Sequence, residues 1–362
     1  PAVHDELVLV VDREGTLHAV AARDGRFRWT VESERTLPLP WGHEGWDYLV
    51  GSVALSAGVA YWGAGDGYVR AADAATGRLL WRFRTGGRVR ATPAIVGDLL
   101  VVGSGDGLVH ALDTRSGEEV WRHETAGTQL NAADFGFDRR QVTASATIDD
   151  GTVYVGSRDA TLYALDARTG RARWTFAEES AWVISTVATD ESRVFSARSS
   201  SGNLRAIRKD DGSEIWAPRP GGMVYSSPVV VWETVYVGAG DGAFSAHDAS
   251  TGEQRWSYRT GGGIWATPVV HEGYAYVGRD DGFVYAFRRG GSLGVRRAVY
   301  FDEAMAPAPA AGAIREAELL RDYLSQRGYE ILDADGFRAF LHDEAGLRRP
   351  AEEPGRPGGR AP

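Results

Sequence analysis

The chain has 362 residues, 43% of them hydrophobic, and a formal net charge of −9 with a pI near 5.5. This acidity argues against a nucleic-acid partner, and no apolar run approaches the ~18 residues that a membrane span needs. Cysteine is absent, which excludes disulfides, thiolate metal sites and thiol nucleophiles, and the 46 glycines suit a large β domain rich in turns.

The chain begins on a β-rich run that returns later. PAVHDELVLVV, from Pro1 to Val11, matches PAIVGDLLVV, from Pro93 to Val102, almost residue for residue. This match predicts that Pro1 opens the first strands of a repeated unit. We expect that a segment upstream of Pro1 has been removed or omitted.

The chain contains a sequence repeat, which is clearest in GDGLVHALDTRSGEEVWR from Gly105 to Arg122. Its Asp-Gly pair between two β-rich runs predicts a tight hairpin, and Asp-x-x-Ser/Thr-Gly predicts a second turn before a last strand with one tryptophan. A short run such as TPAIV, from Thr92 to Val96, precedes each hairpin, so a unit holds four strands. The other copies are Gly65 to Arg82, Gly240 to Ser257, Arg158 to Thr175, two degenerate copies ending at Trp29 and Trp216, and an incomplete one from Asp280.

The spacing of the copies predicts the architecture. Gly67 and Gly107 are 40 residues apart, as are Gly202 and Gly242, and Gly242 and Gly282. This period is typical of a four-stranded propeller blade. Seven units fit within residues 1–290, so we predict an all-β fold, a seven-bladed β-propeller of four-stranded blades.

The turn and the tryptophan strand also carry a family resemblance. AADAATGRLLW, from Ala71 to Trp81, fits the motif Ala-x-Asp-x-x-Thr/Ser-Gly-x-x-x-Trp, the tryptophan-docking motif of quinoprotein-like propellers. The same motif recurs at Ala111 to Trp121, Ala164 to Trp174 and Ala246 to Trp256. Over about four-fifths of its length the chain therefore resembles PQQ-like, BamB-like propeller-repeat proteins of bacteria. The resemblance implies an exported protein, periplasmic or extracellular, although the chain contains no export signal.

Two copies depart from the motif. The first has Ala21 and Asp24 at the Asp and Thr positions, and the fifth has Arg208 and Asp211. We expect these two blades to dock their tryptophans less regularly than the others.

Two inter-blade loops are longer than the rest, Leu37 to Ser52 and Gly127 to Ser145. Strands of a blade alternate in direction, so these insertions share a face with the Asp-Gly hairpins, and the Thr/Ser-Gly turns lie on the opposite face. Aromatic, arginine and carboxylate side chains on a loop rim are typical of binding sites, although aromatic residues also cover blade ends. The predicted binding residues on this face are Trp41, His43, Trp46, Asp47, Arg90, Asn131, Asp134, Arg139, Trp182, Tyr225 and Trp265.

The pattern changes after the seventh unit. Residues 291–345 predict a partial α/β appendage, with strands at 296–304 and 329–337 and a helix at 314–327, and residues 346–362 predict a disordered tail. The seventh blade has no tryptophan strand of its own. We expect either that Gly294 to Phe301 takes its outer position or that the edge stays open.

Enzymatic motifs are weak in this chain. The Asp-Gly pairs lack the D-x-D-x-D-G pattern of a calcium loop, the histidines lack zinc spacings, and no G-x-S-x-G elbow is present. Resemblance to PQQ-dependent dehydrogenases implies an acidic calcium site, a catalytic aspartate and usually a vicinal cysteine pair. The absence of cysteine and the count of seven blades, where those enzymes typically have eight, disfavour that activity.

We therefore predict a non-catalytic binding or scaffold propeller that presents its insertion-loop face to a protein or a small ligand. We predict no catalytic residue, no metal site and no cofactor. We also predict that the chain does not bind nucleic acid and does not span a membrane. Two alternatives stay open: a PQQ-dependent dehydrogenase-like quinoprotein, which would require PQQ with calcium, and a sensor or accessory module of a larger protein.

Overall fold

The computed structural model describes residues 1–37, 51–131, 138–178, 182–271, 273–278 and 284–288, and the backbone of 297–300 and 330–332. The chain divides into two compact units, Pro1–Thr267 and Pro268–Pro362. Apart from one short 3-10 helix, η2 (Ala126–Gln129), the described elements are β-strands, which confirms the all-β prediction. Within the described residues, no helix is both long enough and apolar enough to cross a membrane.

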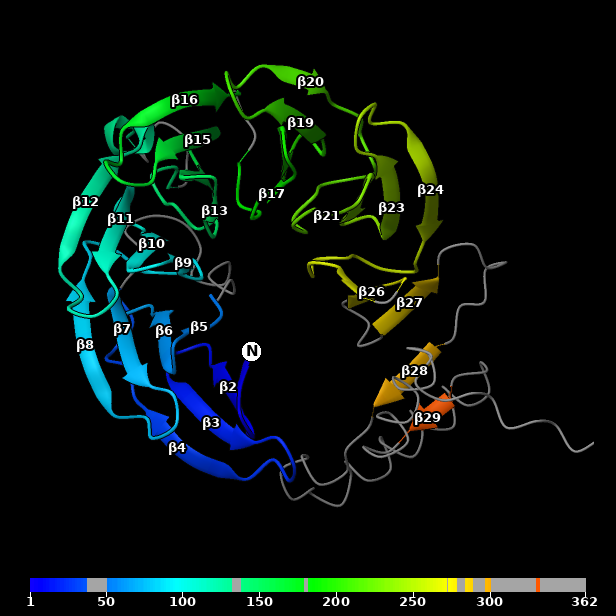
Figure 1. The fold of residues 1–362 in the computed structure, drawn as a ribbon. Coiled ribbons are helices and arrows are strands. Elements are labelled where there is room, and N and C mark those ends of the chain that lie inside the picture. The colour runs from blue at the N-terminus through cyan, green and yellow to red at the C-terminus, as the bar shows by residue number, and fades with distance from the viewer. Residues whose placement is uncertain are drawn as a thin grey trace, which may run out of the picture. The chain divides into compact units, whose positions relative to one another are not determined.

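The first unit contains six antiparallel sheets of four strands, each pairing its strands in chain order (Figure 1). The first three sheets are β1 (Ala2–His4), β2 (Leu7–Val11), β3 (Leu17–Ala21), β4 (Phe27–Val31); β5 (Ala54–Ser56), β6 (Val59–Gly63), β7 (Tyr68–Asp73), β8 (Leu79–Arg84); and β9 (Ala94–Val96), β10 (Leu99–Gly103), β11 (Leu108–Asp113), β12 (Glu119–Glu124). The next three are β13 (Thr147–Asp149), β14 (Thr152–Gly156), β15 (Thr161–Asp166), β16 (Ala172–Ala177); β17 (Ala188–Thr189), β18 (Arg193–Ala197), β19 (Leu204–Arg208), β20 (Glu214–Trp216); and β21 (Val229–Val231), β22 (Thr234–Gly238), β23 (Ala243–Asp248), β24 (Gln254–Arg259).

The first strands of consecutive sheets contact one another, β1 with β5, β5 with β9, and so on to β21, so the sheets radiate from a shared inner edge. Hydroxyl groups join these inner segments. The Thr92 hydroxyl accepts the N–H of Ser52 at 2.7 Å, and the Ser145 hydroxyl accepts the N–H of Thr92 at 2.9 Å. The Ser227 hydroxyl accepts the N–H of Thr186 in the same way at 3.0 Å. The recurrent Thr or Ser before an inner strand therefore links neighbouring blades through a hydrogen bond from a backbone N–H to its hydroxyl.

The second unit begins with a sheet of β25 (Val269–His271), β26 (Tyr274–Gly278) and β27 (Val284–Arg288). β28 (Arg297–Tyr300) pairs antiparallel with β27, so that Val284 faces Ala298. Of the two expectations for the seventh blade, the structure therefore has the one in which the outer position is filled, by residues 297–300 of the predicted segment 294–301. β29 (Glu330–Leu332) pairs parallel with β28, as a β-α-β unit requires, and the predicted helix at 314–327 lies outside the described residues.

The turns follow the chemistry of their residues. Gly107 has φ of 89°, and its N–H donates to the Ser104 carbonyl at 3.2 Å, closing the hairpin that joins β10 to β11. At the next turn the Asp113 carboxylate accepts the N–H of Ser116 at 2.8 Å and its hydroxyl at 3.1 Å. A left-handed backbone strains any residue with a Cβ, which accounts for glycine in both turns.

The last strand of a sheet carries its tryptophan into the next sheet. The register shifts between Ala111 and Leu112, leaving Ala111 opposite Trp121, and the Trp121 indole N–H donates to the Ala167 carbonyl of the fourth sheet at 2.8 Å. A Cβ on Gly170 would lie 2.5 Å from the Trp121 ring, so only glycine permits this approach. The motif is thus shared: the tryptophan of one sheet packs on the Thr/Ser-Gly turn of the following one.

This sharing corrects the expectation for the two degenerate copies. Trp29 donates to the Ala75 carbonyl at 3.0 Å and Trp216 to the Ala249 carbonyl at 3.1 Å, as the tryptophans of the regular copies do. Each of them docks on the regular turn of the sheet that follows. The degenerate turn of the fifth sheet also holds Trp174 through the Lys209 carbonyl at 2.7 Å, because the acceptor is backbone.

Candidate functional site

The insertion-loop face comprises the hairpin tips between second and third strands and the linkers that join one sheet to the next. A buried linker residue donates its N–H to the hairpin of the sheet that the chain has just left, at 3.0 to 3.2 Å. The pairs are Val89 with Ala64, Val142 with Ser104, Val183 with Ser157, Val224 with Ser199 and Ile264 with Ala239. Arg90, Tyr225 and Trp265 each follow one of these buried residues, so the backbone holds them at equivalent positions.

The structure describes only part of the predicted site. The predicted residues within the described ranges are Arg90, Asn131, Arg139, Trp182, Tyr225 and Trp265. Those outside the described ranges are Trp41, His43, Trp46, Asp47 and Asp134. Asn131 is exposed at the end of a described range, and the other five contribute to three separate local arrangements.

The first arrangement is an aromatic pair in which Tyr225 is half-buried and Trp265 is exposed. The rings of Tyr225 and Trp265 lie 4.9 Å apart between centroids, and Trp265 is 42% exposed. Met223, 48% exposed, lies beside them with its sulfur 3.8 Å from the Tyr225 hydroxyl. Aromatic and methionine side chains that remain exposed on a rigid rim suit apolar contact with a partner.

The second arrangement meets at Arg158, a residue that sequence analysis did not select. The Arg139 side chain donates to the Arg158 carbonyl at 3.4 Å, and the Arg158 guanidinium lies 5.1 Å from the centroid of the Trp182 ring. The Trp182 carbonyl in turn accepts the N–H of Ser199 at 3.2 Å. Two predicted residues from different linkers thus meet through one arginine, with Trp182 held by a cation–π contact.

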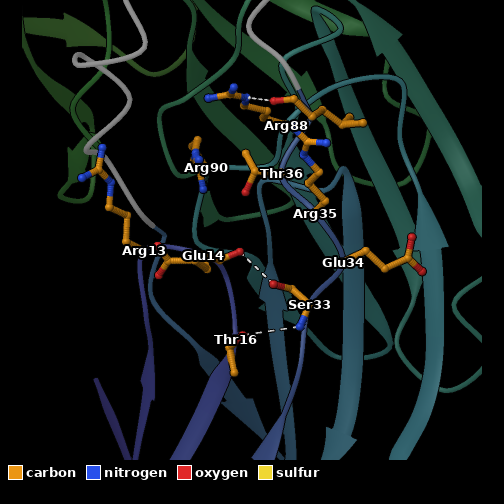
Figure 2. A pocket seen from close by; sticks show the side chains of 10 residues that line it. Arg13, Glu14, Thr16, Ser33, Glu34, Arg35, Thr36, Arg88 and Arg90 are labelled. Carbon is orange, nitrogen blue, oxygen red and sulfur yellow. Dashed lines mark hydrogen bonds between the residues drawn. The ribbon is translucent and has the colours of Figure 1, made fainter.

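The third arrangement is a recess of about 930 Å³ at the linker between the first and second sheets (Figure 2). Of the predicted residues within the described ranges, only Arg90 lines it. The described lining residues are Arg13, Glu14, Thr16, Ser33, Glu34, Arg35, Thr36, Leu37, Arg88 and Arg90. Sequence analysis missed the other three arginines because they come from a hairpin and two linkers that only the packing of the sheets brings together.

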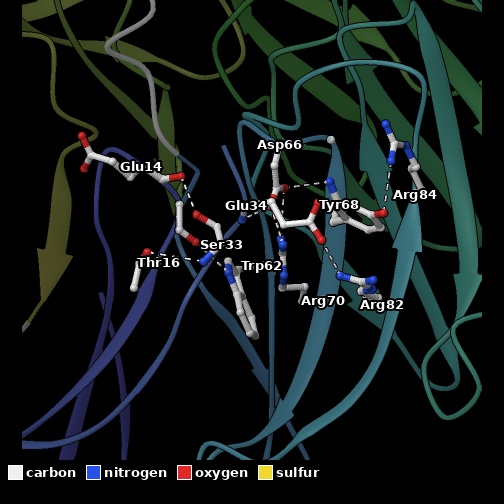
Figure 3. Close-up of polar contacts among 12 residues, drawn as sticks. Glu14, Thr16, Ser33, Glu34, Trp62, Asp66, Tyr68, Arg70, Arg82 and Arg84 are labelled. Atoms are coloured by element: carbon white, nitrogen blue, oxygen red, sulfur yellow. Dashed lines mark hydrogen bonds and ion pairs between the residues drawn. The ribbon is translucent and has the colours of Figure 1, made fainter. Parts of the chain in front are cut away.

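An ion pair lies under this linker (Figure 3). The Asp66 and Arg70 side chains are both buried, and an Arg70 nitrogen lies 3.1 Å from one Asp66 oxygen, with a second contact between the groups. Asp66 also accepts the N–H of Glu34 at 2.7 Å. Burial alone would raise the pKa of Asp66, but the hydrogen bonds from Arg70, Tyr68 and Glu34 outweigh it and hold that pKa below its usual value.

The hairpin aspartates therefore do more than form turns, which sequence analysis did not foresee. Asp66 holds the preceding linker at Glu34, Asp106 accepts the N–H of Gly86 at 2.7 Å, and Asp159 accepts the N–H of Gly127 at 2.9 Å. Each contact joins a hairpin to the linker of the sheet before it. The three linkers that leave the first, second and third sheets are thus each held near their start by a hairpin aspartate.

One buried charge also escaped notice. Arg198 is fully buried, and its three guanidinium nitrogens have no hydrogen-bond partner among the described residues. Burial lowers the pKa of Arg198 to about 10, against the opposing effect of the Glu178 carboxylate 3.7 Å away. The Phe176 ring, 5.6 Å from the guanidinium, provides a cation–π contact. This group lies inside the molecule and offers no surface to a partner.

Stability should depend on pH through His110. This buried ring lies 2.7 Å from Glu119 and 3.4 Å from Asp106, and although burial lowers its pKa, the two carboxylates raise it above the ordinary value. A raised folded-state pKa contributes stability that is present below the unfolded value of about 6.5 and lost as pH rises through the folded-state pKa. Urea titrations across that range should show the parent losing its advantage over His110→Gln as pH rises.

A variant at His247 is expected to show the opposite dependence of stability on pH. Burial lowers the pKa of His247, so the corresponding advantage of the parent over His247→Gln should be lost as pH falls below about 6.5. Equal pH dependence of the parent and His110→Gln would contradict the role assigned to His110.

Among the described residues, no group of three or more His, Asp or Glu side chains is placed to hold a metal ion.

Six repeated four-stranded sheets joined by tryptophan contacts, followed in the chain by a further sheet with the same strand order, define the class of PQQ-like β-propeller repeat proteins. Within that class, the family model described as outer membrane protein assembly factor BamB matches residues 1–175 and 177–307. The chain belongs to this family.

Solved structures agree on the fold. BamB from Moraxella catarrhalis superposes with a TM-score of 0.62 and 23% identity, covering 81% of this chain and 83% of that one. The computationally designed Ika8 protein superposes with a TM-score of 0.56 and 17% identity, covering 79% of this chain and 94% of that one. The fold is thus the predicted seven-bladed propeller.

Two curated relatives are quinoprotein dehydrogenases. The chain is 35% identical over 82 residues to quinoprotein alcohol dehydrogenase PedE of Pseudomonas putida, and 34% identical over 82 residues to quinoprotein ethanol dehydrogenase of Pseudomonas aeruginosa. Each match covers 23% of this chain and 11% of the relative. The chain thus matches about a tenth of the length of these enzymes.

Proposed function

We propose that the chain is a non-catalytic scaffold that binds a protein partner through its insertion-loop face. The observation that carries this proposal is that the arginine-lined recess and the Tyr225–Trp265 pair, with Trp265 exposed, lie on the same face. Exposed aromatic and arginine side chains are the residues that dominate protein interfaces. The described linker residues that the hairpin aspartates hold would lose little freedom on binding.

The opposite face supports the same choice. Its turns use their polar groups internally: Asp73 accepts both the N–H and the hydroxyl of Thr76, and Asp248 accepts the N–H and the hydroxyl of Ser250 and the N–H of Thr251. Nearly identical, self-bonded turns offer little with which to specify a partner.

Membership of the BamB family favours a protein partner over a substrate, and it favours a periplasmic or extracellular location. The local identity with quinoprotein dehydrogenases favours the second candidate, a PQQ-dependent enzyme. We give it less weight because the match spans a tenth of those enzymes and the described residues supply no calcium site. On this proposal the chain works without PQQ.

The structure specifies how the insertions can be removed. The linker Gly86–Arg90 keeps both fixed points, the Gly86 N–H on Asp106 and the Val89 N–H on Ala64. Replacing residues 35–50 and 128–143 with Gly87–Arg90 preserves the corresponding N–H groups of Glu34 and Gly127, which bind Asp66 and Asp159. We expect the melting temperature to stay nearly unchanged and capture of the partner to be lost.

The partner is first identified by mass spectrometry after capture on the parent protein, and binding is then measured with purified components. The matched control changes exposed residues of the opposite face, Arg115→Gln with Glu118→Gln, and should bind as the parent does. If binding survives the loop replacement and is lost in this control, the site lies on the face of the Thr/Ser-Gly turns and the proposal is wrong.

A further inference from the structure

The recess between the first two sheets carries a local charge opposite to that of the whole chain. Four arginines line it against two glutamates, although the net charge of the chain is −9. The Glu34 carboxylate is engaged by Arg82 at 2.7 Å, and Figure 2 shows it directed away from Arg13 and Arg90. Among the described lining residues, Glu14 alone then opposes four guanidinium groups, so their net charge is positive.

Two of the arginines are available to a ligand. Arg13, on a hairpin tip, and Arg35, in the linker, are exposed and make no hydrogen bond or ion pair in the described part of the chain. Arg88 is fixed by donating to the Leu37 carbonyl at 2.5 Å, and Arg90 is buried. The recess thus combines two anchored arginines with two that can turn toward an incoming group.

The recess is also built on a rigid base. The Ser33 hydroxyl donates to the Glu14 carbonyl at 2.7 Å, and the Trp62 indole of the second sheet donates to the Gly15 carbonyl at 3.0 Å (Figure 3). A Cβ on Gly65 would lie 2.9 Å from an Arg90 nitrogen and 2.7 Å from the Thr36 methyl, so this glycine is what admits both side chains. The backbone from which the arginines extend is therefore held in place before a ligand binds.

We propose that this recess binds a short acidic segment of the protein partner through two or more carboxylates; the inference rests on the proposed function and adds the chemistry of the ligand. Guanidinium forks match the geometry of carboxylates and form strong charge-assisted hydrogen bonds with them. The volume of about 930 Å³ lies at the upper end of the range for ligand pockets, which suits several residues of peptide. The overall acidity of the chain disfavours a long polyanion such as nucleic acid.

The proposal is tested by calorimetric titration with a blocked hexaglutamate peptide, with blocked hexaglutamine as the neutral probe. We expect hexaglutamate to bind, hexaglutamine not to bind, and the affinity to fall when salt is raised from about 50 to about 300 mM. Arg13→Gln with Arg35→Gln should weaken binding by about tenfold or more, since a hydrogen bond to a charged group is worth roughly that factor.

Glu14→Gln should tighten binding, because it removes the one lining carboxylate that no described residue neutralises. The matched control is Arg28→Gln with Arg78→Gln, two exposed arginines outside the recess with the same change in charge. Equal weakening in that control, or no binding of hexaglutamate to the parent, would overturn the proposal. Melting curves of all variants show that the fold is retained.

Titrations with citrate and with inorganic phosphate test whether the recess prefers a free small anion to the carboxylates of a peptide. Citrate that binds more tightly than hexaglutamate would assign the recess to a free polycarboxylate, and phosphate that does so would assign it to phosphate; either result overturns the assignment to a peptide segment. If hexaglutamate fails while partner capture still depends on the insertion loops, this inference is wrong and the scaffold function stands.

Discussion

Replacing Trp121 with alanine is expected to lower the free energy of unfolding by about 3–5 kcal/mol, the usual cost of truncating a buried tryptophan. Trp121 is 8% exposed and belongs to a buried cluster with Val101, Val153 and Leu165 from two neighbouring sheets. Its loss removes this inter-sheet packing and leaves the Ala167 carbonyl without the indole donor at 2.8 Å. Denaturant titration followed by circular dichroism measures the change.

The chain offers a tryptophan of the opposite kind as a control. Trp232 is 73% exposed in a turn outside the docking motif, so Trp232→Ala should change stability by no more than about 0.5 kcal/mol. If Trp121→Ala unfolds at the denaturant concentration of the parent, the tryptophan contact contributes nothing to the cohesion of the sheets.

The architecture was predictable because each sheet is encoded locally. The 40-residue spacing of Gly67 and Gly107, the hairpin and the Asp113–Gly117 turn are all set by residues close in sequence, and the strands appear where these signals place them. The docking partner of Trp121 was less accessible, because its acceptor at Ala167 and its glycine at Gly170 belong to the next copy.

The candidate site was predictable only in part, for the same reason. Tyr225 and Trp265 were found because they occupy equivalent positions of successive copies, and the structure places their rings 4.9 Å apart. Arg13, Arg35 and Arg88 come from three different positions of the repeat, and the recess forms where a hairpin of one sheet meets the linkers of two. Residues that meet only through the packing of different sheets show no periodic pattern in the sequence.

Replacing Arg70 with methionine is expected to cost about 3–5 kcal/mol, because it leaves the buried Asp66 carboxylate without its cation. Both side chains are almost inaccessible to solvent, at 2% and 3% exposure. Asp66 would keep the N–H groups of Tyr68 and Glu34, which satisfy only part of its hydrogen-bonding capacity. The change in unfolding free energy is measured by denaturant titration.

The fourth sheet supplies a matched replacement for the same pair. There Asp159 accepts the hydroxyl of Tyr163 at 2.8 Å and the N–H of Gly127 at 2.9 Å, with tyrosine at the position of Arg70. Arg70→Tyr would place the same hydroxyl donor beside Asp66, so it should lower the free energy of unfolding by less than Arg70→Met does. Equal losses in the two variants would show that the volume or charge of arginine matters, and not the donor.

The same pair links stability to the binding face. Asp66 holds the Glu34 N–H, and Glu34 begins the part of the linker that carries Arg35 and Thr36 into the recess. With Arg70 replaced by methionine, burial no longer meets an opposing cation, so the pKa of Asp66 should rise and the carboxylate should protonate on mild acidification. Because that folded-state pKa is held down only in the parent, the parent's advantage over Arg70→Met should shrink as pH falls through the acid range. An advantage that is constant with pH would mean that Asp66 remains ionised without Arg70, stabilised by its backbone donors alone.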